Sequence, residues 1–258
     1  MALYNRIDRK VDAKIVYFGP VSGGKETSIT EIYRSLPPGA RSSFKSVSRQ
    51  EGRVLFFDFT PEDQEIAGYA LRLHLYTVVD DAHDSSIWEM VFNGADGIVF
   101  VADSDPDRQQ ENQSRLKTLH SVLSQKEEGS RIPFVIQYNR RDTPDAPDLE
   151  EMQRHLNPDN VPGFPSVAIT GEGIMPPFQS IVRMILARVS EELPQAFAGS
   201  GEITGASTEI KVHGADEEII LRIAGEAEIS DSRLTVPVMA AAGTTQQKFQ
   251  LVISLEKG

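Results

Sequence analysis

The first 190 or so residues alternate between strand-like and helix-like patterns of hydrophobic positions. Short runs rich in β-branched and aromatic residues predict strands, and stretches with hydrophobic positions three or four residues apart predict helices. The predicted strands are residues 14–18, 53–59, 70–79, 97–102, 133–138 and 166–169. The predicted helices are residues 28–36, 109–125, 149–156 and 177–193. This order predicts an α/β doubly wound fold, in which a mostly parallel sheet carries helices on both faces.

The pattern changes after Pro194. Residues 195–207 are rich in glycine, alanine and serine, which indicates a linker. Four further strands are predicted at residues 209–212, 218–224, 233–239 and 247–255, with no helix between them. The sequence therefore predicts a domain at 1–194, a linker at 195–207 and a small all-β module at 208–258. Because about 60 residues of strand make a marginal domain, we expect the module to pack on the first domain or on another chain.

Composition narrows the class of protein. The formal net charge is −12, from 26 Lys and Arg against 38 Asp and Glu. An acidic surface repels phosphate polymers and anionic lipid, so we expect neither nucleic-acid binding nor membrane insertion. The absence of cysteine excludes disulfides, thiolate catalysis and cysteine-ligated metals. No apolar run reaches the ~20 residues that span a bilayer, and the first residues lack the apolar core of a signal peptide, so we expect a soluble cytoplasmic protein.

One segment carries a chemical motif. Residues 19–27 read Gly-Pro-Val-Ser-Gly-Gly-Lys-Glu-Thr between a predicted strand and a predicted helix. Gly19, Gly24 and Lys25 match a phosphate-binding P-loop, whose backbone N–H groups surround the phosphates while the lysine reaches the outer ones. The Ser or Thr that ligates Mg²⁺ after the lysine is replaced by Glu26, and Thr27 follows. Gly-rich turns without any ligand are common between strands and helices, so the motif alone leaves an ordinary turn as an equal alternative.

Six further stretches give the chain a family resemblance. They are KIVYFGP (14–20), LFFDF (55–59), LHLYTV (73–78), GADGIVFVADS (94–104), IPFVIQYNRRD (132–142) and AITGEGI (168–174). In order, spacing and type they resemble the MglA-like bacterial Ras-superfamily small GTPases of gliding motility and cell polarity. The resemblance covers roughly residues 10–190 and implies a Ras-like P-loop domain that binds GDP or GTP. It also implies protein partners, among them a small roadblock-type (MglB-like) homodimer and polarity proteins.

The resemblance assigns a base-recognition loop. Such GTPases use Asn-Lys-x-Asp, and this chain keeps Asn139 and Asp142 with Arg140 in place of the lysine. The aspartate would accept hydrogen bonds from guanine, and the arginine could lay its stem and guanidinium over the base. Thr170 and Gly171 would supply backbone N–H groups near the guanine oxygen. The alternative for Asp142 is a turn residue before a proline.

The resemblance fits the γ-phosphate and metal machinery badly. Val54 stands at the position of the switch I threonine, and Asp80 and Asp81 stand at the positions of the switch II glycine and glutamine. Together with Glu26, these aspartates place carboxylates where a triphosphate would lie, and two charges ~4 Å apart interact by about 4 kcal/mol at an effective dielectric of ~20. Glu26 could instead ligate Mg²⁺ directly, since carboxylates suit hard cations. The acidic loop around Asp80 and Asp81 could equally be an ordinary solvated surface.

Arg53 completes the set of candidates. The resemblance places it where MglA-like proteins carry an arginine that enters the site in cis and neutralises transition-state charge. Without the glutamine and the metal ligands, Arg53 could instead be an ordinary residue at a strand edge. The sequence therefore favours a degenerate G-protein, or pseudo-GTPase, that serves as a protein-interaction module and binds GDP or no nucleotide. The alternative is an active guanine-nucleotide-binding GTPase that hydrolyses GTP slowly with an atypical metal site.

Overall fold

The structure is a computed structural model, and it describes most of the chain. The described residues are 3–5, 9–49, 52–62, 65–66, 68–79, 85–125 and 132–198, together with strands at 210–213, 218–223, 228–230, 233–242 and 245–254. The chain divides into two compact units, Met1–Pro194 and Gln195–Gly258.

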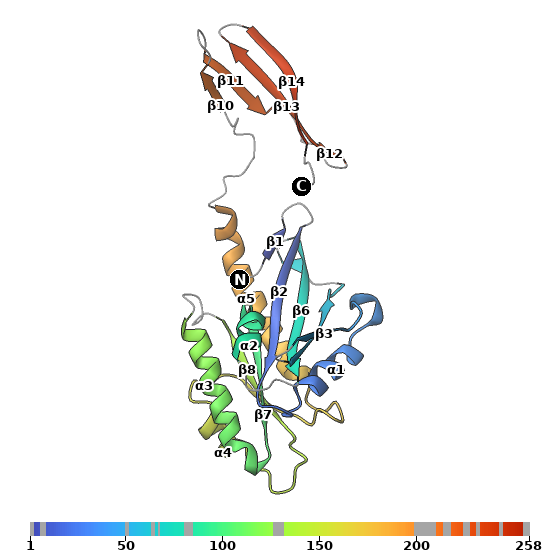
Figure 1. Cartoon of the computed structure of the whole chain (residues 1–258), viewed down its shortest axis with the longest axis vertical. Coiled ribbons are helices and arrows are strands. Elements are labelled where there is room, and N and C mark those ends of the chain that lie inside the picture. Colours follow the sequence, from blue (N-terminus) through green and yellow to red (C-terminus); the bar gives the residue numbers. More distant parts are fainter. Residues whose placement is uncertain are drawn as a thin grey trace. The chain divides into compact units, whose positions relative to one another are not determined.

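A mixed sheet forms the centre of the first unit (Figure 1). Its strand order is β3-β4-β6-β2-β7-β8-β9, with β1 paired to β2 and β5 paired to β6. β6, β2, β7, β8 and β9 run parallel to one another, whereas β4 is antiparallel to β6 and β3 is antiparallel to β4. The bounds are β1 Leu3–Asn5, β2 Lys10–Phe18, β3 Lys45–Arg49, β4 Gly52–Phe59, β5 Glu65–Ile66, β6 Tyr69–Val79, β7 Gly97–Asp103, β8 Phe134–Asn139 and β9 Gly163–Pro165.

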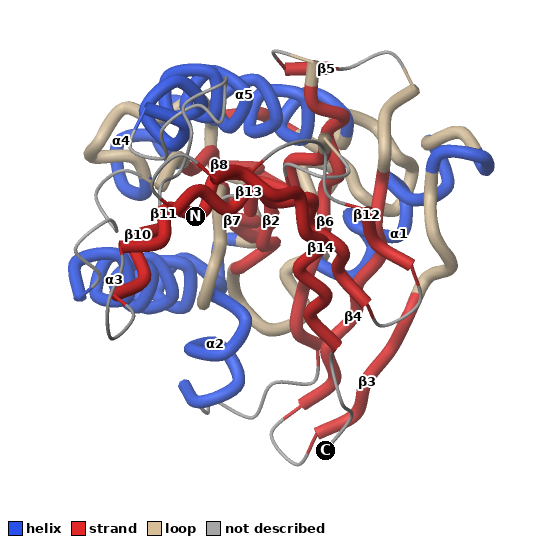
Figure 2. The backbone as a smooth tube through the Cα atoms, turned by 90° about the horizontal axis from the view of Figure 1, so that it is seen from above, coloured by secondary structure: helices blue, strands red, loops and turns tan. Residues whose placement is uncertain are grey.

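Helices cover both faces of this sheet, and Figure 2 shows α5 and α3 on opposite sides of the strands. α2 (Ser85–Phe92), α3 (Gln109–Gln125) and α4 (Leu149–Leu156) share one buried core with Phe18 and Phe100 of the sheet. α1 (Lys25–Ser35) and α5 (Met175–Ala198) pack on the other face. At Gly97 a Cβ would lie 2.7 Å from Ile181 on α5, so only glycine lets this helix approach so closely. The predicted doubly wound fold is confirmed.

Several element boundaries differ from those that the sequence predicts. The last strand of the sheet is β9, and the predicted strand at 166–169 is wrong: these residues form a turn in which Val167 bridges Glu172. The chain has to turn there because Ser166 and Ala168 both face Asn139 at the end of β8. β3 and α2 were not predicted, since one has a single apolar residue and the other follows an acidic run. α5 continues through Pro194 to Ala198, although a proline inside a helix costs about 3 kcal/mol.

The second unit contains antiparallel strands. β10 (Ile210–His213) pairs with β11 (Glu218–Ile223), and β11 pairs with β13 (Arg233–Ala242). β13 also pairs with β12 (Glu228–Ser230) and, along its whole length, with β14 (Thr245–Ser254). The small all-β module that the sequence predicts is thus present. Within the described part of the chain, no helix combines the length and apolar character that crossing a membrane requires.

A polar cluster joins three strands on one face of the main sheet. His74 on β6 lies between Asp58 on β4, 2.7 Å from its Nδ1, and Asp12 on β2, 3.1 Å from its Nε2. Arg72 also donates to Asp12. Burial raises the pKa of Asp12, but the hydrogen bonds from Arg72 and His74 outweigh burial and hold the pKa below its ordinary value.

The acid stability of the protein should depend on Asp12. A folded-state pKa below the unfolded one stabilises the fold above the unfolded pKa, and this contribution is lost as pH falls through the folded pKa. Asp12→Asn is therefore expected to lower the free energy of unfolding at neutral pH by about 1 kcal/mol or less, because the cluster borders solvent. It should also flatten the loss of stability below about pH 4. Urea unfolding at pH 7 and pH 3 measures both; equal losses at the two pH values, or the same flattening in the exposed control Asp107→Asn, would contradict the assignment.

Candidate functional site

The predicted P-loop lies at the carboxyl end of β2 and leads into α1, where parallel-sheet folds bind ligands. Two of its glycines are required by close contacts. A Cβ at Gly19 would lie 2.1 Å from the Val101 carbonyl oxygen on β7. A Cβ at Gly24, whose φ is 99°, would lie 2.0 Å from Nδ2 of Asn139. The loop is therefore wrapped closely against the ends of β7 and β8, as a phosphate cradle has to be.

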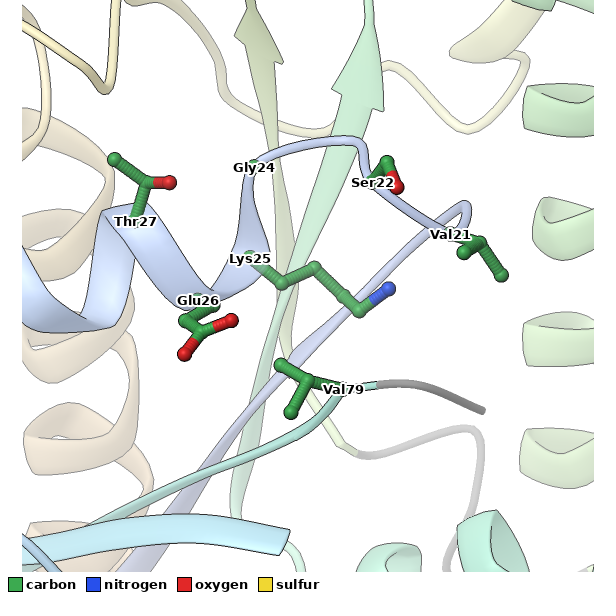
Figure 3. Close-up of a pocket in the computed structure, with 7 residues that line it drawn as sticks. All are labelled: Val21, Ser22, Gly24, Lys25, Glu26, Thr27 and Val79. Atoms are coloured by element: carbon green, nitrogen blue, oxygen red, sulfur yellow. The ribbon is translucent and has the colours of Figure 1, made fainter. Parts of the chain in front are cut away.

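A cavity of about 150 Å³ lies inside this loop (Figure 3). The Lys25 side chain crosses it and is only 4% exposed. Its Nζ donates to the carbonyl oxygens of Gly19 (3.1 Å) and Pro20 (2.7 Å), and phosphate oxygens would compete with these acceptors for the ammonium group. The lining residues are Val21, Ser22, Gly24, Lys25, Glu26, Thr27 and Val79. The chain thus places the lysine and the start of a helix around a space of the size of a phosphate group or two.

Asn139 connects the P-loop with the predicted base-recognition loops. Its Nδ2 donates to the Gly23 carbonyl oxygen at 2.9 Å. Its Oδ1 accepts the Ala168 N–H at 2.9 Å and the Ser166 hydroxyl at 3.3 Å. Asn139 is buried, so these hydrogen bonds are shielded from water. One side chain therefore joins three segments that are about 115 and 30 residues away from one another in the sequence.

Arg140 does not lie free to cover a base in this structure. Its Nη1 donates to Oδ2 of Asp103 at 3.1 Å, and its φ of 60° reflects the sharp turn after β8. Burial raises the pKa of Asp103, while the Asp105 N–H and the guanidinium groups of Arg140 and Arg108 act in the opposite direction. The arginine thus compensates a buried carboxylate, and its contact with guanine remains a prediction.

The other base-loop candidates are brought to the same edge. Asp142 is exposed two residues after Arg140, and the neighbouring Arg141 N–H donates to the Ser166 carbonyl oxygen at 3.1 Å. The N–H groups of Thr170 and Gly171 donate within their own turn, to Val167 and Ala168. Their predicted contact with a guanine oxygen would therefore require this turn to open, and it remains a prediction.

A second network, which sequence reasoning missed, holds the outer side of the P-loop. The Val21 N–H donates to Oε1 of Glu111 on α3 at 3.0 Å. Arg108 donates to the Val21 carbonyl oxygen and also pairs with Glu111, both at 2.6 Å. The only signal in the sequence was the position of these residues just after a buried strand. They hold the two peptide groups on either side of the Val21 Cα in place from outside the cavity.

Glu26 and Arg53 face each other at the rim of the cavity. Arg53 on β4 is the antiparallel neighbour of Val79, which lines the cavity from the end of β6. Its Nη2 lies 3.5 Å from Oε1 of Glu26, and the two side chains are 38% and 49% exposed. The structure thus joins the residue in the metal-hydroxyl position to the candidate cis arginine.

The described residues do not suit a divalent cation in its usual place. The carboxylate that replaces the hydroxyl is engaged by a guanidinium, and Val54, in the switch I threonine position, is a buried core residue. Among the described residues, no group of three His, Asp or Glu side chains is arranged to hold a metal. Asp80 and Asp81 lie outside the described residues.

Comparison with known proteins places this geometry in context. Residues 57–185 match the model of the ADP-ribosylation factor family. The chain is 37% identical over 195 residues to the mutual gliding-motility protein MglA of Myxococcus xanthus (strain DK1622). That alignment covers 74% of this chain and 99% of the relative.

Proposed function

The chain belongs to the Ras superfamily of small GTPases as an MglA-like member, and from this premise we propose that it is a guanine-nucleotide-binding interaction module that does not cycle by hydrolysis. The observation that carries the proposal is the contrast within one site. The cradle is intact, with Lys25 inside the loop and Asn139 joining the P-loop to the base loops. Glu26 and Val54, by contrast, stand at the two positions where related GTPases carry the hydroxyl groups that bind Mg²⁺ and contact the γ-phosphate.

The proposed process is bacterial motility or polarity control, in which the chain would offer a surface to protein partners. The support is the relative MglA, whose name refers to gliding motility. A roadblock-type homodimer is the partner that we propose first, since the resemblance runs through the domain that would contact it. The bound nucleotide would stabilise this surface, and hydrolysis would not switch the surface on and off, because the switch residues that respond to the γ-phosphate have changed.

The proposal is tested by titrating the full chain with fluorescent GDP, GTP and ADP. Binding of guanine nucleotide about tenfold or more tighter than ADP is expected, because a site built to hydrogen-bond one base rejects another. Incubation with GTP should release no phosphate beyond the uncatalysed background. Folded protein that binds no nucleotide, or that turns over GTP repeatedly, would contradict the proposal.

Slow hydrolysis is the second candidate function, and the position of Arg53 at the cavity rim favours it. If Arg53 neutralises charge in a transition state, Arg53→Gln should lower single-turnover hydrolysis by about 10³-fold. The interaction-module proposal instead expects no measurable hydrolysis in either protein. Quench-flow or overnight single-turnover assays with excess protein separate the two.

A further inference from the structure

The pair formed by Glu26 and Arg53 determines which phosphate chain the site can accept. We propose that this pair makes the site select a nucleoside diphosphate bound without a divalent cation, with Arg53 supplying the positive charge that Mg²⁺ supplies elsewhere. The inference rests on the proposed function, because it concerns the same nucleotide site. It extends that function by naming the form of nucleotide and the residues that choose it.

Glu26 stands at the start of α1, beside the cavity. It is the second residue of α1, directly after Lys25, and its carboxylate borders the cavity in Figure 3. Thr27, the next hydroxyl along the chain, extends from the other side of the helix start in the same view. A carboxylate therefore stands where P-loop proteins carry the Mg²⁺-binding hydroxyl.

Arg53 brings a positive charge to the rim of the cavity. Because Arg53 pairs with Val79 across β4 and β6, the sheet register brings its side chain to the cavity rim. There its guanidinium lies 3.5 Å from Glu26. The two side chains remain partly exposed, so the pair is loose enough for phosphate oxygens to share the guanidinium. Lys25 inside the loop and Arg53 at the rim then provide two cations for a diphosphate.

The γ-phosphate of GTP would lie less favourably than a diphosphate beside this pair. Each added phosphate oxygen beside Glu26 would meet a like charge, and the attraction of Arg53 is already divided between the carboxylate and the incoming phosphates. A divalent cation would compete with the guanidinium for the same carboxylate. A diphosphate has no γ-phosphate, so it brings fewer oxygens beside Glu26 while its own oxygens can still contact Lys25 and Arg53. The pair therefore favours GDP over GTP and makes Mg²⁺ dispensable.

The test measures dissociation constants of fluorescent GDP and GTP for the full chain, each with Mg²⁺ and with EDTA. Wild type is expected to bind GDP equally within about twofold in the two buffers and GTP about tenfold more weakly. Glu26→Thr should strengthen GTP binding in both buffers, because it removes the carboxylate charge, and by about a further tenfold or more in Mg²⁺, because it restores the hydroxyl. Glu26→Gln, which keeps the shape without the charge, should strengthen GTP binding in both buffers. Arg53→Gln should weaken GDP binding about tenfold in EDTA.

Matched controls lie on α4, outside the site. Glu150→Thr and Arg154→Gln make the same exchanges at exposed positions and should leave all four constants unchanged. The inference is overturned if Mg²⁺ tightens GDP binding to wild type more than about tenfold, since Glu26 would then be a metal ligand. It is also overturned if Glu26→Thr binds GTP as wild type does. If neither wild type nor Glu26→Thr binds any nucleotide while both are folded by circular dichroism, the proposed function itself fails.

Discussion

Replacing Asn139 by alanine is expected to lower the affinity for GDP by about 100-fold. The substitution removes the acceptor of the Ala168 N–H and the donor to the Gly23 carbonyl oxygen, both buried contacts of 2.9 Å. Without Asn139, binding energy has to be used to bring the two loops to their bound spacing, and a cost of about 2.7 kcal/mol corresponds to a factor of 100 in binding. The loss arises because the P-loop and the base loop would no longer be held at a common distance.

Two measurements test the expected effect of Asn139→Ala. Titration with fluorescent GDP reports the affinity, and urea unfolding without nucleotide should show a loss of about 2 kcal/mol. Ser166→Ala is the matched control: it removes the longer hydroxyl contact to Asn139 and the acceptor of Gln137 Nε2, leaves both contacts of Asn139 at 2.9 Å in place, and should weaken binding by no more than about fivefold. If Asn139→Ala bound GDP as tightly as Ser166→Ala does, the connecting role of Asn139 would be wrong.

Asp96→Ala is expected to cause the largest loss of stability, about 3–5 kcal/mol. The Asp96 side chain is 2% exposed, and its Oδ1 accepts from Nη2 of Arg188 on α5 at 2.8 Å. Its Oδ2 accepts the Lys14 N–H on β2 at 2.8 Å. Removing the carboxylate leaves a largely buried guanidinium and a strand N–H without this acceptor, so α5 loses its charged attachment to the sheet.

Urea unfolding at neutral pH measures this loss. Asp107→Ala, an exposed aspartate after β7, is the control and should change the free energy of unfolding by no more than about 0.5 kcal/mol. Asp96→Ala and Arg188→Ala should be non-additive, because each breaks the same pair. Additive losses would show that the ion pair is not the source of the effect.

Much of the fold could be predicted because its strands are local hydrophobic patterns. β7, for example, is apolar along nearly its whole length, as a strand buried on both faces has to be. β3 could not be predicted in the same way, because it is held by backbone hydrogen bonds to β4 and has a single apolar residue. The strand predicted at 166–169 is a turn because the Ser166 hydroxyl and the Ala168 N–H donate to Asn139 on another strand. The local hydrophobic pattern does not reveal such contacts.

The candidate site, like the fold, could be predicted only in part from local sequence. By itself the sequence predicted a P-loop, a base-recognition loop with Asn139 and Asp142, and a glutamate, Glu26, at the position of the metal hydroxyl, because each depends only on which residue stands at which position. Only the tertiary structure decided that Arg53 reaches Glu26, that Arg140 serves Asp103, and that Glu111 and Arg108 hold Val21. These contacts depend on strand register and on helix placement, which bring together residues 27 to 90 positions apart. The arrangement of side chains at the candidate phosphate site therefore depends on the folded sheet, whereas the motif indicates only where in the sequence the site lies.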